Sequence, residues 1–118
     1  MLLGKQVRLN RLLHEDGRLL AVAVDQAIAR GIFDELMPIE RKISEIVKGG
    51  ADAITMHKGI ADYCFHQHAG KTSLIFKAST FSPFQPDSDV LTATVEEAIR
   101  FGADAISVGA IVGGDDQP

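Results

Sequence analysis

The residues Gly50-Ala51-Asp52-Ala53-Ile54 return unchanged later in the chain as Gly102-Ala103-Asp104-Ala105-Ile106. Each copy follows an amphipathic stretch and opens an apolar one. Glycine accepts the left-handed backbone conformation that commonly ends a helix, and a short apolar run is typical of a buried strand. The distance between the copies corresponds to two β/α units and not to a solenoid repeat. The repeat therefore predicts the same event twice: a helix ends at a glycine, and a short loop leads into a buried strand.

Outward from this repeat, the sequence alternates between segments of strand character and segments of helix character. Short apolar runs predict buried strands over 18–25, 51–56, 72–78 and 103–108. Amphipathic segments predict helices over 5–13, 38–48, 60–69 and 94–101. The last of these helices opens with the capping box Thr94-Val95-Glu96-Glu97. Residues 26–37 and 79–83 are expected to be loops.

This order predicts an α/β protein with a parallel sheet and helical crossovers. Two architectures agree with it. One is a small doubly wound sheet, and the other is the first four units of a TIM (β/α)8 barrel, which needs about 250 residues in full. The first predicted strand lacks a following Gly-x-Gly-x-x-Gly or Walker loop, which disfavours a nucleotide-binding sheet. We therefore expect residues 1–118 to form a single domain, an N-terminal half-barrel truncated after four parallel β/α units.

Composition and charge argue against several classes of function. The 118 residues carry a net charge of −4, whereas nucleic-acid binding needs a basic face. No apolar run approaches the ~18 residues that a membrane span requires. The apolar stretch at the N-terminus is too short for a signal peptide, because the charged Lys5 follows after four residues. Cys64 is the single cysteine and cannot form an internal disulfide. We expect a cytoplasmic protein that binds neither nucleic acid nor membrane.

Polar residues gather where the predicted strands end, and in both architectures the carboxyl ends of the strands carry the chemistry. Asp25 ends the first strand, where it could transfer protons or form an Asx turn. His57 and Lys58 follow the second strand and are candidate substrate-binding residues. Lys58 could also attack a carbonyl, pair with a phosphate or carboxylate, or remain a solvated loop residue. Ser79 and Thr80 follow the third strand, where they could hydrogen-bond a substrate hydroxyl or begin a turn.

Two further polar features are interpreted as structural. Lys77 lies within the third predicted strand, where we expect an exposed position on an imperfect strand; the alternative is a barrel interior, in which the lysine would need a charge partner. The histidines His57, His66 and His68 invite a zinc site, but His66 and His68 stand two apart on a predicted helix and so point in different directions. We therefore expect no metal and no cofactor.

The motifs taken in order resemble a known family. They are Arg8-Leu9-Asn10-Arg11-Leu12, Gly17-Arg18, Ala23-Val24-Asp25, Gly49-Gly50-Ala51-Asp52-Ala53, Lys58-Gly59-Ile60, Ala78-Ser79-Thr80, Val95-Glu96-Glu97-Ala98-Ile99 and Gly102-Ala103-Asp104-Ala105-Ile106-Ser107-Val108. This set is similar to that of the class I aldolases of the archaeal-type fructose-bisphosphate aldolase group. The group also holds the aminodideoxyheptulosonate synthases and autoinducer-2 aldolase relatives. The resemblance covers nearly the whole chain but only the first four of the family's eight units.

The resemblance implies a barrel that makes or breaks a carbon–carbon bond of a phosphosugar through a lysine Schiff base. The family's acid–base carboxylate at the end of its first strand maps onto Asp25. Its tyrosine and Schiff-base lysine lie on strands five and six, and these positions, like its main phosphate-binding loops, fall beyond Pro118. The chain departs from the family at Gln26-Ala27, where His-Gly is usual, and at Gly109, where His is usual.

Three hypotheses follow from these observations. The first is an aldolase half, acting on a small phosphorylated sugar such as fructose 1,6-bisphosphate and incomplete without a missing C-terminal half. The second is a non-catalytic half-barrel whose unpaired strand edges and apolar inner face pair with a second copy, so that eight strands close in a homodimer. The third is a small α/β domain that binds a phosphate ligand without covalent chemistry.

Overall fold

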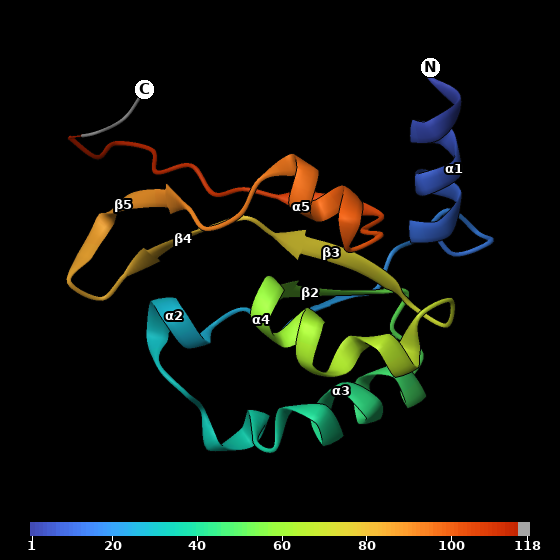
Figure 1. The fold of residues 1–118 in the computed structure, drawn as a ribbon, viewed down its shortest axis with the longest axis horizontal. Coiled ribbons are helices and arrows are strands. Elements are labelled where there is room, and N and C mark those ends of the chain that lie inside the picture. Colours follow the sequence, from blue (N-terminus) through green and yellow to red (C-terminus); the bar gives the residue numbers. More distant parts are fainter. Residues whose placement is uncertain (116–118) are drawn as a thin grey trace.

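The computed structural model describes residues 1–115 as a parallel sheet flanked by helices, with a hairpin beyond one end of the sheet (Figure 1). The strands are β1 (Ala21–Ala23), β2 (Ala53–His57), β3 (Ser73–Lys77), β4 (Ser79–Ser82), β5 (Gln85–Leu91) and β6 (Ala105–Ser107). The helical elements are α1 (Leu3–Leu12), α2 (Ala27–Arg30), η1 (Asp34–Leu36), α3 (Ile39–Lys48), α4 (Lys58–Ile60), η2 (Ala61–Phe65), η3 (His66–His68) and α5 (Val95–Arg100). The main sheet has the order β1-β2-β3-β6, with every pair parallel. The predicted succession of parallel β/α units is confirmed.

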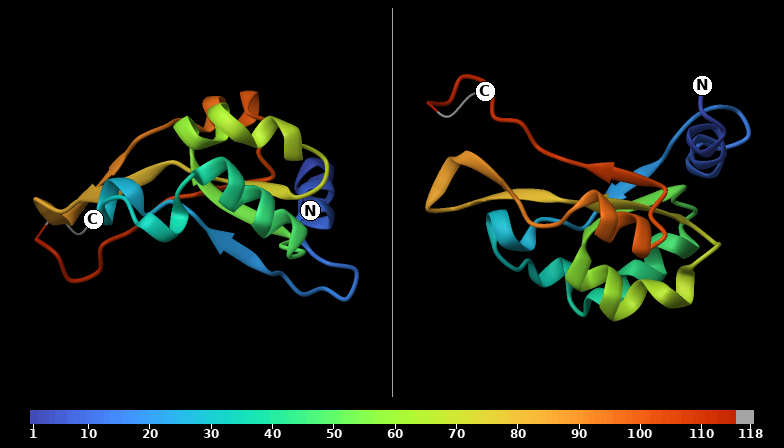
Figure 2. Two further views of the ribbon diagram at one scale, coloured as in Figure 1. Left: turned by 90° about the horizontal axis from the view of Figure 1, so that it is seen from below. Right: turned by 45° about the horizontal axis from the view of Figure 1, so that its top comes forward.

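The sheet buries one face against the helices. Figure 2 shows α3, the α4–η3 segment and α5 on the same side of the sheet. Alternate residues of a strand point to opposite faces of the sheet. The strand side chains that face the helices join helix side chains in one core cluster. Its largest fully buried members are Phe76, Ile43, Ile54 and Met56. The opposite face carries the register-aligned Ala23, Thr55 and Ile75, each at least partly exposed. In a closed barrel this second face would line the interior.

The two copies of the repeat adopt the same local structure. Gly50 and Gly102 have φ angles of 88° and 69°, the left-handed region that a Cβ disfavours. The aspartate two residues later then joins the neighbouring strand through two bonds. The Asp52 amide donates to the Leu20 carbonyl and its carboxylate accepts from the Leu20 amide, at 2.9 and 2.7 Å. Asp104 makes the same two bonds with Leu74, at 3.0 and 3.2 Å. The repeat thus sets the register where each strand begins.

The capping box predicted before α5 is present. The Thr94 hydroxyl accepts the Glu97 amide at 3.1 Å, and the Glu97 carboxylate accepts the Thr94 amide at 2.8 Å. These two bonds satisfy donors that the first helical turn leaves without an intrahelical partner. The predicted helix after Pro38 is also confirmed, ending at Gly49.

Three predicted boundaries are wrong. The first strand spans only residues 21–23 and is not buried on both faces, because it lies at the edge of the sheet; Leu20 is 55% exposed. Residues 26–37 are not one loop, since they contain α2 and η1. The helix predicted over 60–69 begins at Lys58 and changes pitch twice, through the π-helical η2 and the 3₁₀-helical η3.

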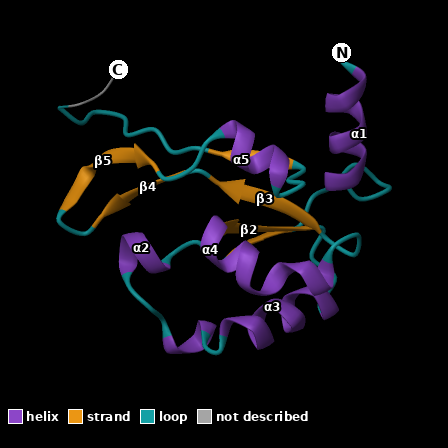
Figure 3. Cartoon of the chain, viewed as in Figure 1, coloured by secondary structure: helices purple, strands orange, loops and turns teal. Residues whose placement is uncertain are grey.

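The loop predicted over 79–83 is instead the first strand of a hairpin. Figure 3 shows β4 and β5 side by side as a hairpin. The two strands pair antiparallel, with Thr80 opposite Val90 and an irregularity between Thr80 and Ser82. The composition of 85–89, Gln-Pro-Asp-Ser-Asp, hides this strand, because Pro, Asp and Ser are depleted in strands. Within residues 1–115, no helix has the length and apolar character needed to cross a membrane.

Candidate functional site

The carboxyl ends of β1, β2 and β3 bring three charged or titratable side chains to one face of the sheet. His57 is the register partner of Lys77, and Asp25 follows β1, two residues after the register partner of Thr55. Since residues two apart share a face, Asp25 and His57 extend the row of Ala23 and Thr55. This is the face away from the helical core. The sequence predicted functional residues at this end of the sheet, and the structure places a polar layer there on the face that the helices do not cover.

A cavity of about 180 Å³ opens at this end of the sheet, and we call it the mouth cavity. It lies between the segment that follows β1 and the β4–β5 hairpin. Its polar lining residues are Asp25, Gln26, Arg30, Lys77, Thr80 and Asp89. The volume exceeds that of several water molecules at roughly 30 Å³ each, so the cavity can admit part of a small organic ligand.

His57 is buried beside the mouth cavity. His57 is only 9% exposed, and its Nε2 atom has no hydrogen-bond partner among the described residues. Burial lowers the pKa of His57 below the ordinary 6.5, because the imidazolium form is desolvated. The negative charge of Asp25 raises this pKa and the positive charge of Lys77 lowers it. The ring therefore lies within electrostatic range of both groups and favours its neutral form.

Lys77 is not the exposed lysine that the sequence predicted. It lies in β3 in register with His57 and Ser107, is partly buried and lines the mouth cavity. Neither Lys77 nor Arg30 forms an ion pair with any residue in the described range 1–115. The cavity therefore has two positive charges that no residue of the described range neutralises through an ion pair.

Ser79 and Thr80 lie at the mouth but make local hydrogen bonds. The Ser79 hydroxyl accepts the Gly109 amide at 2.6 Å and is almost fully buried. The Thr80 hydroxyl donates to the Phe81 carbonyl at 3.1 Å, and Thr80 also lines the mouth cavity. Thr80 can therefore face a ligand, whereas Ser79 joins the start of the hairpin to the chain that follows β6.

Lys58 points elsewhere. Its Nζ lies 2.9 Å from Glu97 Oε1 at the start of α5, and Lys58 does not line the mouth cavity. The ammonium of Lys58 lowers the pKa of the Glu97 carboxyl, and the Thr94 amide adds to this effect. The structure thus brings Asp25, His57 and Thr80 together and leaves Lys58 on the helical side of the sheet. The substrate-binding role of Lys58 stays a prediction.

The sequence did not identify Arg30 and Asp89 as candidate residues of the mouth cavity. Arg30 belongs to a short helix where a loop was expected, and Asp89 belongs to the unrecognised hairpin. The Asp89 carboxylate lies against Gly109, so closely that any side chain at position 109 would collide with it. The sequence could have indicated the position of Lys77. Residues 73, 75 and 77 alternate with the core residues Leu74 and Phe76, so the Lys77 side chain lies on the opposite face of the sheet.

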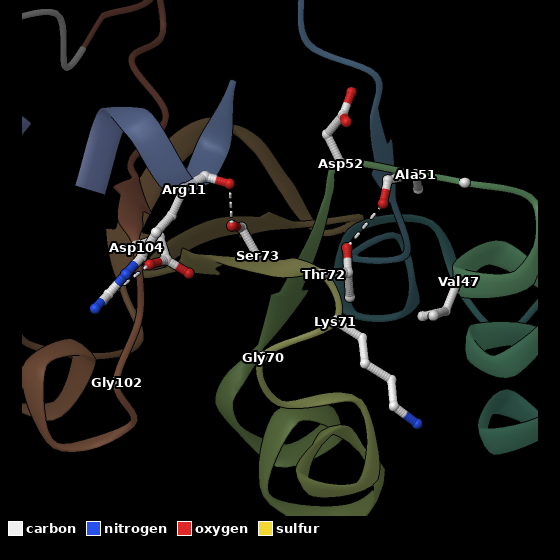
Figure 4. A pocket seen from close by; sticks show the side chains of 11 residues that line it. Arg11, Val47, Ala51, Asp52, Gly70, Lys71, Thr72, Ser73, Gly102 and Asp104 are labelled. Atoms are coloured by element: carbon white, nitrogen blue, oxygen red, sulfur yellow. Dashed lines mark hydrogen bonds and ion pairs between the residues drawn. The ribbon is translucent and has the colours of Figure 1, made fainter. Parts of the chain in front are cut away.

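A larger cavity, of about 610 Å³, lies at the opposite end of the sheet (Figure 4). Its polar groups largely satisfy one another. Arg11 faces Asp104 at 3.6 Å, the Ser73 hydroxyl donates to the Arg11 carbonyl, and the Thr72 hydroxyl donates to the Ala51 carbonyl (Figure 4). In β/α folds the amino ends of the strands support stability and the carboxyl ends carry the chemistry. We therefore place the candidate site at the mouth cavity.

Among residues 1–115, no group of three or more His, Cys, Asp or Glu side chains is arranged to hold a metal ion. The mouth cavity offers carboxylates and cations, and the buried His57 imidazole, which favours its neutral form, lies beside it. These groups can bind polar ligands, orient them and move protons.

Comparisons with known proteins identify the family of the chain. The family described as DeoC/LacD family aldolase matches residues 19–117. The chain is 41% identical to a 2-amino-3,7-dideoxy-D-threo-hept-6-ulosonate synthase of Halobacterium salinarum, covering 98% of this chain and 43% of that protein. It is 33% identical to a 2-amino-4,5-dihydroxy-6-oxo-7-(phosphonooxy)heptanoate synthase of Streptomyces griseus, covering 95% of this chain and 42% of that protein.

Solved structures show the same fold. A crystal structure of an archaeal fructose 1,6-bisphosphate aldolase superposes with a TM-score of 0.67 at 24% identity. A second, with its catalytic lysine covalently bound to the carbinolamine intermediate of the substrate, gives a TM-score of 0.70 at 23% identity. Each match covers 86% of this chain and 42% of the other chain. The expected first units of a barrel are confirmed, and the chain spans less than half the length of these relatives.

Proposed function

The chain belongs to the DeoC/LacD aldolase family, and from this premise we propose that it is the N-terminal half of a class I aldolase active site. The observation that carries the proposal is the mouth cavity at the carboxyl ends of the strands, with Asp25 in its wall. The Schiff-base lysine that the family resemblance places on a later strand would come from a second half of the barrel. By this proposal, residues 1–118 form one domain that is catalytically incomplete alone.

Asp25 acts in this proposal as the proton-transfer group. In a class I aldolase a lysine amine condenses with a ketone carbonyl and releases water. The carbon–carbon bond then breaks, its electron pair moves towards the resulting iminium to give an enamine, and the hydroxyl proton goes to a carboxylate. Asp25 faces the cavity and has no ion pair in the described chain, so it is free to take that proton.

The proposed substrate is a small phosphorylated sugar. Two relatives are named as synthases of seven-carbon compounds with a 2-amino group, and one name also includes a 7-phosphonooxy group. A reaction that joins a phosphosugar to a second carbonyl compound is consistent with both names. We further propose that the protein works in the cytoplasm, since Cys64 is a buried free thiol.

The partner that completes the barrel is either a C-terminal half or a second copy of this chain. The edge strands β1 and β6 each lack a neighbour on one side in the main sheet. Leu19, Leu20 and Val108 lie beside these edges and are 45%, 55% and 59% exposed. Such edges and apolar side chains favour association with further strands.

The test uses Schiff-base trapping. The chain is incubated with dihydroxyacetone phosphate, reduced with borohydride and measured by intact mass. In parallel, residues 1–115 are joined to the C-terminal half of the Halobacterium salinarum relative, giving a protein that we call the fused barrel. We expect no adduct on the isolated chain, but an adduct and aldol turnover in the fused barrel.

The Asp25→Asn variant of the fused barrel separates binding from proton transfer. It should still form the adduct but lose turnover by at least about 100-fold, the usual size of a general acid–base contribution. An adduct on the isolated chain would contradict catalytic incompleteness. Full turnover by Asp25→Asn would remove Asp25 from the mechanism.

A further inference from the structure

Basic and acidic residues are separated along the chain. Residues 1–14 contain Lys5, Arg8 and Arg11 but neither Asp nor Glu. Residues 78–99 show the reverse, because they contain Asp and Glu but no Lys, Arg or His. The first segment contains α1, and the second contains the β4–β5 hairpin and the start of α5. The chain therefore carries one basic element and one acidic element.

These two elements lie at opposite ends of the molecule (Figure 1, Figure 2). α1 is held near the amino ends of the strands, where the Arg8 side chain donates to the Ala103 carbonyl at 3.4 Å and the Ser73 hydroxyl donates to the Arg11 carbonyl at 2.8 Å. The hairpin follows β3 and extends beyond the carboxyl ends of the strands. A contact between the basic and the acidic element therefore requires two copies of the chain.

One face of α1 points away from the rest of the molecule. Leu3, Val7, Asn10 and Arg11 share this face, since residues three and four apart on a helix lie side by side. We call it the outer face, because it lies opposite the buried Leu12. Leu3 is 79% exposed and Val7 is 39% exposed. A second barrel half that covers the edges and the open face of the sheet leaves the outer face uncovered.

The tip of the hairpin exposes an aromatic ring beside carboxylates. Phe84 is 94% exposed. A hollow of about 300 Å³ lies beside it, lined by the residues that we call the hairpin tip: Phe84, Gln85, Pro86, Asp87, Ser88 and Asp115. Neither carboxylate of the hairpin tip forms an ion pair with any residue of the range 1–115. Aromatic side chains are common anchors of protein interfaces, so the hairpin tip has the composition of a docking surface for a basic partner.

We propose that the hairpin tip of one copy binds the outer face of α1 in a second copy, with Phe84 packed on Leu3 and Val7. Asp87 and Asp115 then face the basic helix. Opposite charges select which surfaces meet, and the buried apolar area supplies affinity. Each copy offers both surfaces, one at each end, so the contact is heterologous and joins copies into a ring or a row. It uses no residue that lines the mouth cavity and does not depend on the proposed aldolase function.

Neither surface fits a second copy of itself. Two hairpin tips in contact would bring carboxylates together without a cation, and two outer faces would bring the cations of two helices together. Like charges repel at such distances, whereas a hairpin tip on α1 brings opposite charges together. Charge therefore favours the head-to-tail arrangement over a symmetric one.

The experiment pairs two variants that each lack one of the surfaces. Leu3→Glu disrupts the outer face and keeps the hairpin tip, and Phe84→Ser does the reverse. The ¹⁵N-labelled Phe84→Ser chain is titrated, at about 0.01 M salt, with the unlabelled Leu3→Glu chain or with an unlabelled chain that carries both changes. We expect the Leu3→Glu chain to shift the amides of residues 3–11 and to bind at least about tenfold more tightly than the double variant, which lacks the aromatic anchor. Association through the open sheet face would act equally in both titrations.

Further variants test the role of charge. Asp87→Lys in the unlabelled chain should weaken binding about fivefold, and Asn10→Glu in the labelled chain, which adds a carboxylate to the outer face, should restore it. Salt at about 0.15 M shortens the Debye length from about 30 Å to about 8 Å and should weaken the contact about tenfold, so that only association through the sheet face remains. Tyr63→Ser and Lys71→Glu are matched controls that should change nothing, because both residues are exposed and belong to neither surface.

If the isolated chain gives no dispersed spectrum, the fused barrel replaces it with the same variants. Amides of α1 that do not move with the Leu3→Glu chain, or that move equally with the double variant, would overturn the proposal. Binding that neither salt nor Asp87→Lys weakens would also overturn it, since charge would then not select the surfaces. Turnover of the fused barrel tests the proposed function separately and should survive both Leu3→Glu and Phe84→Ser, because neither residue lines the mouth cavity.

Discussion

Asp52 and Asp104 perform the same task in the two copies of the repeat, but in different surroundings. The Asp104 side chain is only 11% exposed, and it also faces Arg11. The Asp52 bond to Leu20 lies at the exposed edge of the sheet. A hydrogen bond to a charged group contributes more where removing it leaves a buried donor unpaired.

We therefore predict that Asp104→Ala lowers the free energy of unfolding by about 1–3 kcal/mol and Asp52→Ala by about 0.5–1 kcal/mol. Urea unfolding followed by circular dichroism measures both. Asp62→Ala, at an exposed position of η2, serves as the control and should have little effect. Equal losses in all three variants would show that the bonds to Leu20 and Leu74 do not matter.

His57 makes stability depend on pH. Its pKa is lowered in the folded chain, so the unfolded chain binds more protons below about pH 6.5. The stability that comes from the neutral ring is complete above that pH. It is lost as the pH falls through the lowered pKa of the folded state.

We predict that the urea midpoint falls between pH 7.5 and pH 5.5, and that His57→Asn reduces this fall. Burial also lowers the pKa of His68, so part of the dependence should remain in the variant. His66→Asn is the control, because His66 is exposed. An unchanged pH dependence in His57→Asn would mean that this ring is not held neutral by the fold.

At the same scale, the sequence located part of the candidate site. Asp25 was recognisable because it ends an apolar run, and His57 because it follows one. The prediction for Lys77 was wrong because burial of a lysine in a strand is unusual, although its alternation with Leu74 and Phe76 indicates which face it takes. Asp89 could not be found, since its position depends on a hairpin and on the space that Gly109 leaves.

At the scale of elements, the start of α5 is fixed by local bonds. The helix is only six residues long, so its stability depends strongly on its first turn. Removing an N-cap hydroxyl typically costs about 1 kcal/mol. Glu97 serves both the cap and the ion pair with Lys58.

We predict that Thr94→Ala lowers the free energy of unfolding by about 1 kcal/mol and that Thr94→Ser restores most of it. Thermal unfolding of the two variants against the parent provides the measurement. Thr94→Ala matching the parent would show that packing of Ala98, and not the cap, holds α5 in place.

The elements differ in how far sequence could predict them. α3 and α5 were predicted because each has a local signal at both ends, Pro38 and Gly49 for the first and the capping box and Gly102 for the second. The hairpin was missed because cross-strand pairing stabilises residues of low strand propensity. The length of β1 was overestimated because the same apolar residues pair less extensively at an edge.

At the scale of the whole molecule, four parallel strands cover only part of a barrel. Alternation of apolar strands and amphipathic helices was enough to predict the parallel units, because each helix needs a sheet face to bury its stripe. What covers the second face of the sheet was not predictable from this alternation. In the structure that face holds Ala23, Thr55 and Ile75 in one layer.

This uncovered face gives the last prediction, which concerns self-association. A lysine in place of Ile75 can extend into solvent from an open sheet but would bury an unpaired charge inside a closed eight-stranded barrel. We expect the parent chain to form dimers at high concentration in sedimentation velocity and Ile75→Lys to remain monomeric. Ile99→Lys, on the 61% exposed side chain of α5, should dimerise like the parent. A parent that stays monomeric at every concentration would leave a separate C-terminal half as the partner that closes the barrel.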